Sequence, residues 1–452
     1  CLSEISTHSI AIFYRVPALP VALKLIKEAK RLKITTFWEV DDLIFDREVL
    51  EGSRTLAQLD RSVYKGLIDG AVSYKEAMLS CDKGIASTVE LANEMHNAGL
   101  NEVFVVENAL DQQTLTHAKK INLSSHNPGD GFIRLVYGSG TNTHNIDFEE
   151  ASVALLSILK SFPYVKLRII GRLELVSEFS HFESQIERIP FCSYEEYLYH
   201  LAECDINIAP LENYIFNEAK SNIKFIEASA VKIPSACSPR SAFIPAIEHG
   251  INGFLCESSD DWTRSLTSLV NSTELRHKIG SAAYSSILEH YSPENIAKSQ
   301  LLPIVNKLHS RPQNKTRLLS VNIYYAPQSF GGATIVAEET NKILNTCEDF
   351  DVSVFTALPL EMLSAYDLRR YEVDGINIFG FGLPPTLSPK EQFENSNAIA
   401  PFEKVLSAVK PDIVHLHSIQ GIGISIINLC IEKQIKFIIT LHDAGGFVAG
   451  SL

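Results

Sequence analysis

Side chains suited to binding an anion gather in one short stretch of this 452-residue chain. A polar turn with Lys220, Ser221 and Asn222 opens a helical pattern with one apolar face, and Lys224 and Glu227 lie inside that pattern. The first N–H groups of a helix have no partner within the helix, so they can bind a phosphate. The stretch therefore predicts a phosphate site, with a carboxylate nearby for a hydroxylated group such as a ribose. An ordinary amphipathic surface helix is the alternative interpretation.

A second turn suited to an anion follows a strand predicted at residues 133–137. Gly138, Ser139 and Gly140 occupy this turn, and glycines allow the backbone to come close to an anion. A turn that only connects a strand to a helix would also favour these residue types. The sequence lacks the G-x-G-x-x-G spacing here, which argues against a classical dinucleotide site.

Carboxylates follow another predicted strand directly. Asp41 and Asp42 lie at its carboxyl end, where the ligand crevices of parallel α/β sheets form. His442 and Asp443 occupy the corresponding place near the end of the chain. We therefore predict these four residues as catalytic candidates, with helix capping in a solvated turn as the alternative for the two aspartates. The histidines near this rim lack the ligand spacing of a metal site, so we predict no metal.

Strand-like and helical runs alternate along most of the chain, which is typical of parallel α/β sheets with helical crossovers. We expect an α/β fold of Rossmann-like, doubly wound parallel sheets. The predicted divisions are a partial sheet at 1–122, a complete doubly wound domain at 123–309, a polar linker at 310–316 and a third unit at 317–452.

Composition narrows the class of protein. The net charge of −14 and the pI near 5.5 argue against nucleic acid as a partner. The eight cysteines form no C-x-x-C pair, which favours a reducing, cytoplasmic location. No apolar run reaches the length of a membrane span, although peripheral association with a membrane stays open. The chain begins at a cysteine and ends just after a glycine-rich turn, so we expect a fragment of a longer protein.

Three segments carry a family resemblance. Residues 216–228 (Phe-Asn-Glu-Ala-Lys-Ser-Asn-Ile-Lys-Phe-Ile-Glu-Ala) resemble the donor-binding turn and helix of GT-B fold glycosyltransferases, in particular those of family 4, the group 1 type. Residues 244–255 resemble the I-x-x-G-x-x-G-x-L segment that closes the donor sheet of this family. Gly331 and Gly332 resemble the glycine pair that brings the acceptor and the donor phosphate to a helix, and we predict them as such a turn.

The resemblance implies roles for particular side chains of the donor site. Glu227 matches the second of two family glutamates and would hold the nucleotide ribose. The first family glutamate falls on Ala219, and Glu218 lies one residue out of register, so either Glu218 takes that role or a different donor is used. The Arg and Lys that often bind the pyrophosphate in this family are not in their expected places.

Three other basic side chains are the available cations for a diphosphate. They are Arg172, Lys220 and Lys224, and a clamp built from them is a hypothesis. For the two lysines, a solvated helix face is the alternative interpretation.

The resemblance also implies a function. The chain would be a hexosyltransferase-like enzyme that moves a sugar from a nucleotide-sugar to a glycan or a lipid-linked acceptor, with retention of configuration, no obligatory metal and no cofactor. A cell-surface polysaccharide pathway is the context suggested by analogy. Two alternatives stay open. One is a nucleotide-sugar 2-epimerase, and the other is a degenerate, non-catalytic transferase module.

An internal similarity suggests how the domains are arranged. Residues 10–42 align without a gap on residues 411–443, with apolar positions largely matched. Their offset is the size expected of one whole enzyme of the resembled family. We therefore expect parts of two tandem modules: the end of one N-terminal domain, its complete C-terminal domain, and the start of the next N-terminal domain.

Overall fold

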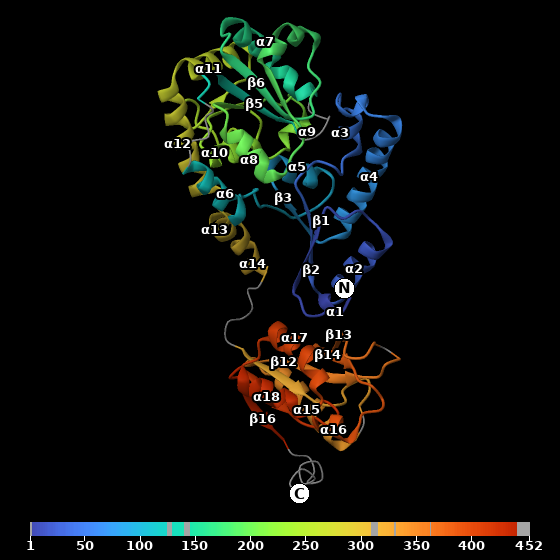
Figure 1. Cartoon of the computed structure of the whole chain (residues 1–452). Helices are drawn as coiled ribbons and strands as arrows, with labels where there is room; N and C mark the ends of the chain where they lie inside the picture. Colours follow the sequence, from blue (N-terminus) through green and yellow to red (C-terminus); the bar gives the residue numbers. More distant parts are fainter. Residues whose placement is uncertain are drawn as a thin grey trace. The chain divides into compact units, whose positions relative to one another are not determined.

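The computed structural model divides into two compact units, shown with their helices and strands in Figure 1. The central unit consists of Ile12–Ala22 and Phe37–His309. The terminal unit consists of Cys1–Ala11, Leu23–Thr36 and Ser310–Leu452. The residues that the structure describes are 2–123, 129–139, 145–308, 315–329, 331–361 and 363–440.

A six-stranded parallel sheet organises the central unit. Its strands, in spatial order, are β10 (Phe254–Leu255), β9 (Ser235–Cys237), β8 (Ile206–Ala209), β5 (Ile133–Ser139), β6 (Val165–Gly171) and β7 (Ile186–Ile189). The order runs outward from β5 in both directions, so the sheet is doubly wound as predicted. Every described pair in it is parallel.

Helices cover both faces of this sheet. The helices of this segment are α6 (Gln112–Asn122), α7 (Asn145–Ser161), α8 (Tyr194–Ala202), α9 (Ile215–Glu218), α10 (Ile223–Ala230), α11 (Ser259–Asn271) and α12 (Thr273–His290), followed by α13 (Pro293–Ile296) and α14 (Leu302–Leu308). A 3₁₀ segment spans Ser177–Gln185, and a π-helical segment joins α13 to α14 at Ala297–Leu301.

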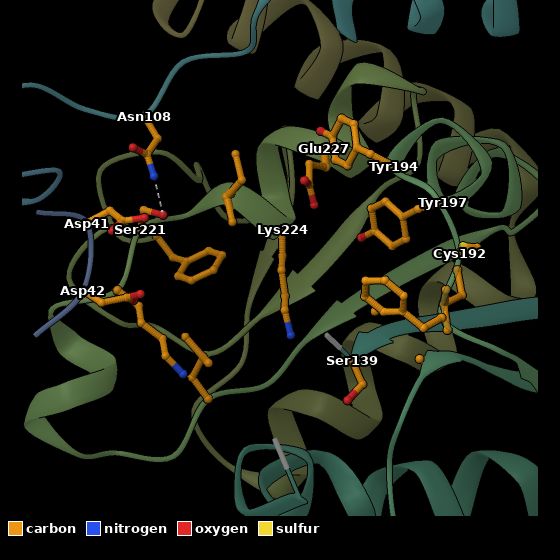
Figure 2. A pocket seen from close by; sticks show the side chains of 18 residues that line it. Asp41, Asp42, Asn108, Ser139, Cys192, Tyr194, Tyr197, Ser221, Lys224 and Glu227 are labelled. Carbon is orange, nitrogen blue, oxygen red and sulfur yellow. Dashed lines mark hydrogen bonds between the residues drawn. The ribbon is translucent and has the colours of Figure 1, made fainter. Parts of the chain in front are cut away.

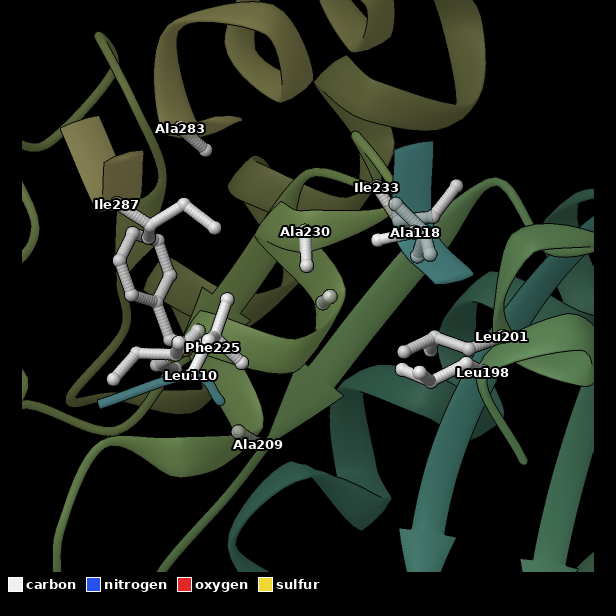
Figure 3. Packing of buried hydrophobic residues seen from close by; sticks show 14 of the residues in the cluster. Leu110, Ala118, Leu198, Leu201, Ala209, Phe225, Ala230, Ile233, Ala283 and Ile287 are labelled. Carbon is white, nitrogen blue, oxygen red and sulfur yellow. The ribbon is translucent and has the colours of Figure 1, made fainter. Parts of the chain in front are cut away.

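The alternation of side chains along β5 shows how the two faces acquire separate cores. Val136 belongs to a cluster with Phe225 of α10, part of which Figure 3 shows. Leu135 and Tyr137 belong to the cluster on the other face, where the Tyr137 ring lies 5.1 Å from the ring of Phe148 on α7. Because both faces are covered, most residues of β5, β6 and β8 are apolar, which is why the sequence pattern identifies these three strands.

A smaller parallel sheet precedes this one in the chain. Its order is β1 (Ile10–Tyr14), β2 (Thr35–Val40), β3 (Lys83–Ala86) and β4 (Val103–Val105), and β2 is the predicted strand that ends just before Asp41. The accompanying helices are α1 (Leu2–Ile5), α2 (Pro20–Arg31), α3 (Arg47–Glu51), α4 (Arg61–Ser80) and α5 (Val89–Asn97), with a 3₁₀ turn at Leu56–Gln58.

Helix α6 was not predicted. The sequence division places its residues in the first domain, but Leu115, Ala118 and Ile121 pack in the same cluster as Phe225 of the central sheet. By packing, α6 therefore belongs with the central sheet.

The terminal unit contains a second six-stranded sheet. Its order is β13 (Leu368–Val373), β14 (Ile376–Gly382), β12 (Phe350–Leu358), β11 (Thr316–Val321), β15 (Ile413–Leu416) and β16 (Lys436–Ile439). The helices after β11 are α15 (Gly332–Thr346), α16 (Pro389–Phe393), α17 (Ile399–Val409) and α18 (Ser425–Glu432), with a 3₁₀ turn at Ser396–Ala398.

One strand of this sheet departs from the predicted parallel pattern. β13 runs antiparallel to β14, because the two strands are joined by the tight turn Asp374-Gly375. Both turn residues have positive φ, 50° and 77°, as a two-residue hairpin turn requires. Among the described residues, no helix combines the length and the apolar character needed to cross a membrane.

Candidate functional site

A cavity of about 550 Å³ opens in the central unit at the carboxyl ends of its strands. It lies where the strand order reverses, because β5 has β6 on one side and β8 on the other. Ligands of open α/β sheets bind at this switch point. Figure 2 shows the side chains that line the cavity, which are Asp41, Asp42, Asn108, Gly138, Ser139, Ile170, Gly171, Phe191, Cys192, Tyr194, Tyr197, Leu211, Lys220, Ser221, Ile223, Lys224, Glu227 and Phe243.

The cavity brings together eight of the residues singled out by sequence. They come from three places that are distant in the chain: the end of β2, the end of β5, and the turn with the first two turns of α10. In that order they are Asp41, Asp42, Gly138, Ser139, Lys220, Ser221, Lys224 and Glu227.

Lys220 is held by a buried carboxylate from α7. Its Nζ lies 3.4 Å from Oδ2 of Asp147, whose side chain is only 2% exposed. The other carboxylate oxygen of Asp147 accepts hydrogen bonds from Nδ2 of Asn217 at 2.7 Å and from the backbone N–H of Glu212 at 3.1 Å. This network fixes the turn before α10 against the start of α7.

Lys224 lies one turn further along, and its surroundings differ. Its amine is buried and lies 4.4 Å from the centroid of the Tyr137 ring, with no hydrogen-bond partner among the described residues. Burial lowers the pKa of Lys224 from 10.5 to about 8, and Asp147 opposes this shift. In Figure 2 the side chain extends into the middle of the cavity.

Glu227 lies next to the aromatic wall of the cavity. Burial raises the pKa of its carboxyl from 4.5 to about 7, while hydrogen bonding from the hydroxyls of Tyr194 and Tyr197 opposes the shift. The Tyr194 and Tyr197 rings stack with centroids 6.2 Å apart. Gly138 makes room for this wall, because a Cβ at that position would lie 2.8 Å from the Tyr197 hydroxyl oxygen.

The two aspartates form a charged cluster with Arg15 at the end of β1. A guanidinium nitrogen of Arg15 lies 3.0 Å from Oδ1 of Asp41 and 3.5 Å from Oδ2 of Asp42. Burial, and then the neighbouring charge of Asp41, raise the pKa of Asp42, while Arg15 and Lys220 oppose the shift. The cluster therefore supplies the cavity with two carboxylates that are oriented by the guanidinium of Arg15.

Hydrogen bonds join the smaller sheet's loops to the turn before α10. Nδ2 of Asn108, which follows β4, donates to the Ser221 hydroxyl at 3.0 Å. The Thr88 hydroxyl donates to the carbonyl of Ala219 at 2.8 Å. Residues that follow β3 and β4 therefore help to position the turn.

Three of the predicted donor-binding residues do not line the cavity. Oε2 of Glu218 accepts hydrogen bonds from the backbone N–H and the hydroxyl of Ser241, both at 2.8 Å. Glu218, which lies one residue away from the position of the first family glutamate, therefore does not place its carboxylate in the cavity. Nδ2 of Asn222 donates to the Tyr291 hydroxyl at 2.9 Å. Arg172 is exposed, and its carbonyl accepts from the Ser139 hydroxyl.

The remaining candidates lie elsewhere. Gly140, His442 and Asp443 fall outside the described residues. Gly331 and Gly332 belong to the terminal unit, where Gly331 has φ 83° just before α15. A Cβ on Gly331 would meet no atom within 4 Å, so its conformation, and not crowding, accounts for the glycine.

The sequence reasoning missed the aromatic wall, Asn108 and Cys192. One signal was available for the wall: Ser193 and Glu196 form a capping box, which places Tyr194 and Tyr197, three residues apart, on one face of the first turn of α8. Within the described part of the chain, no three His, Cys, Asp or Glu side chains are grouped as a metal site would require.

Comparisons with known proteins bear on the central unit. The family model described as "Glycosyl transferases group 1" matches residues 124–286. This match confirms the predicted resemblance for the segment that runs from β5 into α12. A search of curated proteins finds no match.

Three of the similar solved structures illustrate the range of the likeness. A mutant of S. aureus TarM, in complex with fondaparinux, alpha-GlcNAc-glycerol and UDP, is 18% identical over 61% of this chain and 51% of that one, with a TM-score of 0.42. Anabaena HepE in complex with UDP is 13% identical over 66% and 79%, with a TM-score of 0.45. The C-terminal domain of LpcC from Francisella tularensis is 21% identical over 42% and 96%, with a TM-score of 0.31. The chain thus spans about half the length of the TarM structure.

Proposed function

We propose that this chain transfers a sugar from a nucleotide-sugar to a hydroxyl of a glycan or a lipid-linked acceptor, and that the cavity of the central unit binds the donor. The main support is the coincidence of two findings. The segment that matches group 1 glycosyl transferases supplies α10 and the turn before it, and this turn opens on the cavity at the switch point with Lys220, Lys224 and Glu227 lining it.

The chemistry of such a transfer suits the charges in the cavity. The bond between the anomeric carbon and the diphosphate oxygen breaks, and the nucleoside diphosphate leaves with added negative charge. The acceptor oxygen bonds to the anomeric carbon and gives up its proton. Preorganised cations stabilise a charge that develops in this way, and the lysines are in place to supply them. Glu227 would accept hydrogen bonds from the ribose.

Asp41 and Asp42 are the carboxylates that we assign to the sugar and acceptor side of the reaction. They line the cavity from the end of β2 and not from the donor turn. Retention of configuration, independence from metal ions and a cytoplasmic location belong to the proposal. So does the arrangement of residues 1–122 and 317–452 as parts of the N-terminal domains of two tandem modules.

Two other functions are distinguished by their products. A 2-epimerase would interconvert nucleotide-sugars without an acceptor, and the carboxylates Asp41 and Asp42 are the observation in its favour. A non-catalytic module would leave every nucleotide-sugar unchanged. Transfer to an acceptor, or slow hydrolysis of a donor, would contradict the non-catalytic interpretation.

The first experiment is a thermal unfolding screen with UDP, GDP, ADP, CMP and dTDP, alone and as sugar conjugates. A ligand at a hundred times its Kd stabilises the folded state by about 2.7 kcal/mol, so one nucleotide should raise the Tm clearly. Tryptophan fluorescence follows the central unit alone, because both tryptophans, Trp38 and Trp262, are buried in it.

Variants connect the stabilisation to the cavity. Glu227→Ala should abolish the nucleotide-induced shift, whereas Glu274→Ala, which removes an exposed carboxylate on α12, should retain it. If no nucleotide shifts the Tm of the wild type, donor binding by this cavity is wrong. If the shift survives in Glu227→Ala, the nucleotide binds elsewhere or without the ribose contact.

A further inference from the structure

The amine of Lys224 is the feature of the cavity that the fold itself leaves unexplained. It is buried, extends into the cavity, and has no hydrogen-bond partner among the described residues. An ammonium group removed from water without a partner is costly, so proteins pair such groups. A group of this kind in a binding cavity indicates a ligand that supplies the missing negative charge.

The groups around Lys224 do not supply that charge. Asp147 on α7 has the largest effect among the carboxylates that favour the charged amine, but its oxygens are engaged by Asn217, Glu212 and Lys220. Glu227, on the same helix, interacts with the hydroxyls of Tyr194 and Tyr197 on α8.

The remaining neighbours of the amine are not anions near neutral pH. Tyr137 on β5 presents its ring, and burial raises the pKa of the Cys237 thiol on β9 well above its usual value. Lys220 adds a like charge that disfavours the ammonium form.

Lys220 and Lys224 are therefore not equivalent. Lys220 already has a buried carboxylate at 3.4 Å, and an incoming phosphate would have to share it with Asp147. Lys224 has a cation–π contact with Tyr137 and no fixed anion. The attraction available to a new anion is greater at the lysine whose charge is not already neutralised.

We propose that Lys224, and not Lys220, receives the diphosphate of the donor, and that donor binding draws a proton onto the Lys224 amine. This inference rests on the proposed function, since it takes a nucleoside diphosphate as the ligand. It adds which lysine binds that group and the change in protonation that accompanies binding.

The proton uptake follows from linkage. A diphosphate next to the amine favours its charged form, so the pKa of Lys224 rises on binding. With a pKa of about 8 in the empty cavity, binding takes up about half a proton near pH 8 and close to a whole one near pH 9. Near pH 7 the amine is already mostly protonated and the uptake is small. Glu227 has a pKa of about 7, so it is mostly ionised above pH 8.

The first test is calorimetric titration of the wild-type chain with UDP, GDP and ADP at about pH 7, pH 8 and pH 9, in Tris and in HEPES. Because the two buffers have different ionisation enthalpies, the difference in observed heat gives the number of protons taken up. We expect uptake that increases from pH 7 to pH 9. Binding without proton uptake across this range would overturn the inference and leave the proposed function intact.

The second test compares three variants, in each of which one lysine is replaced by methionine. Lys224→Met should weaken nucleotide binding about 10- to 100-fold, as the loss of a charge-assisted contact does, and should abolish the proton uptake. Lys220→Met should retain the uptake. Lys278→Met, at an exposed position of α12, is the control and should leave both unchanged.

Circular dichroism establishes whether each variant is folded, and the wild-type titration does not depend on any variant. Equal loss of affinity in Lys220→Met and Lys224→Met, with uptake retained in both, would refute the assignment to Lys224. If none of the three nucleotides binds the wild type, the proposed function fails first and this inference with it.

Discussion

Replacing Glu227 by glutamine should make the central unit more stable at alkaline pH while impairing the proposed donor site. The carboxyl of Glu227 is buried in the cavity, and burial raises its pKa from 4.5 to about 7. The folded protein therefore holds this proton more tightly than the unfolded chain does. Glutamine keeps the shape of the side chain and removes the charge that burial disfavours.

The sign and size follow from the two pKa values. Between about pH 4.5 and pH 7 the folded state binds more protons than the unfolded state, so stability falls as the pH rises through this window. One pKa unit corresponds to about 1.36 kcal/mol, which gives a penalty of up to about 3 kcal/mol above pH 7. Glu227→Gln loses this penalty but also loses the attraction of Glu227 to Lys224, so we expect a net gain of about 1–3 kcal/mol.

Urea unfolding of the wild type and of Glu227→Gln at about pH 5 and about pH 8 measures this difference. Tryptophan fluorescence is the signal, since Trp38 and Trp262 report only on the central unit. We expect nearly equal stabilities at the lower pH, with a gap that opens toward the higher pH. Glu274→Gln, at an exposed site on α12, should show no such gap. A Glu227→Gln protein that is less stable than the wild type at pH 8, or equally shifted at both pH values, would refute the reasoning.

Two further predictions concern packing in the central unit, and both are measured by the same urea unfolding. Gly280→Ala should cost about 1–3 kcal/mol or more, because its Cβ would lie 2.0 Å from the carbonyl oxygen of Lys232; Gly66→Ala, with no atom within 4 Å, should be neutral or stabilising by up to about 1 kcal/mol. Phe225→Ala should cost about 3–5 kcal/mol, since the ring is fully buried in the cluster of Figure 3. Phe191→Ala, 78% exposed, should stay within about 0.5 kcal/mol. Equal effects within either pair would contradict the packing argument.

The strands of the central sheet could be predicted where both of their faces are buried. β5, β6 and β8 are mostly apolar, although Arg134, Arg168 and Asn207 are buried in them, and an apolar strand of this kind is the direct consequence of burial on two faces. β7 was missed, because Glu187 and Arg188 interrupt its pattern. The Glu187 carboxylate pairs with Arg134 of β5 at 3.1 Å and with Arg168 of β6 at 2.8 Å. A charged residue that is typical of a loop in the sequence pattern is therefore neutralised by arginines from two other strands of the sheet.

Helix α6 was missed for a different reason. Its apolar residues Leu115, Ala118 and Ile121 have helical spacing, but the surface that they cover belongs to the central sheet. A short amphipathic pattern does not identify its partner, since most of the stability of such a helix comes from tertiary packing.

The resemblance of residues 216–228 to a donor-binding turn could be stated from sequence, and the family match at residues 124–286 covers this segment. The role of each side chain in it could not be identified. Glu218 and Glu227 are both acidic and close to the turn, but only Glu227 lines the cavity, because Glu218 turns away to Ser241. The direction of each glutamate side chain depends on the path of the backbone through this turn, and no local sequence pattern predicts that path.

The sequence by itself determined the alternation of strands and helices and the place of the polar turn before α10, because both depend on local periodicity and on the residue types at a helix start. It left Lys220 and Lys224 equivalent, four residues apart on one helical pattern. Only the tertiary structure distinguished them. It brings Asp147, 73 positions earlier than Lys220 in the chain, within 3.4 Å of Lys220 and leaves Lys224 buried without a hydrogen-bond partner among the described residues. Burial and pairing depend on contacts between distant segments, and these contacts set the charge that each lysine offers to a ligand.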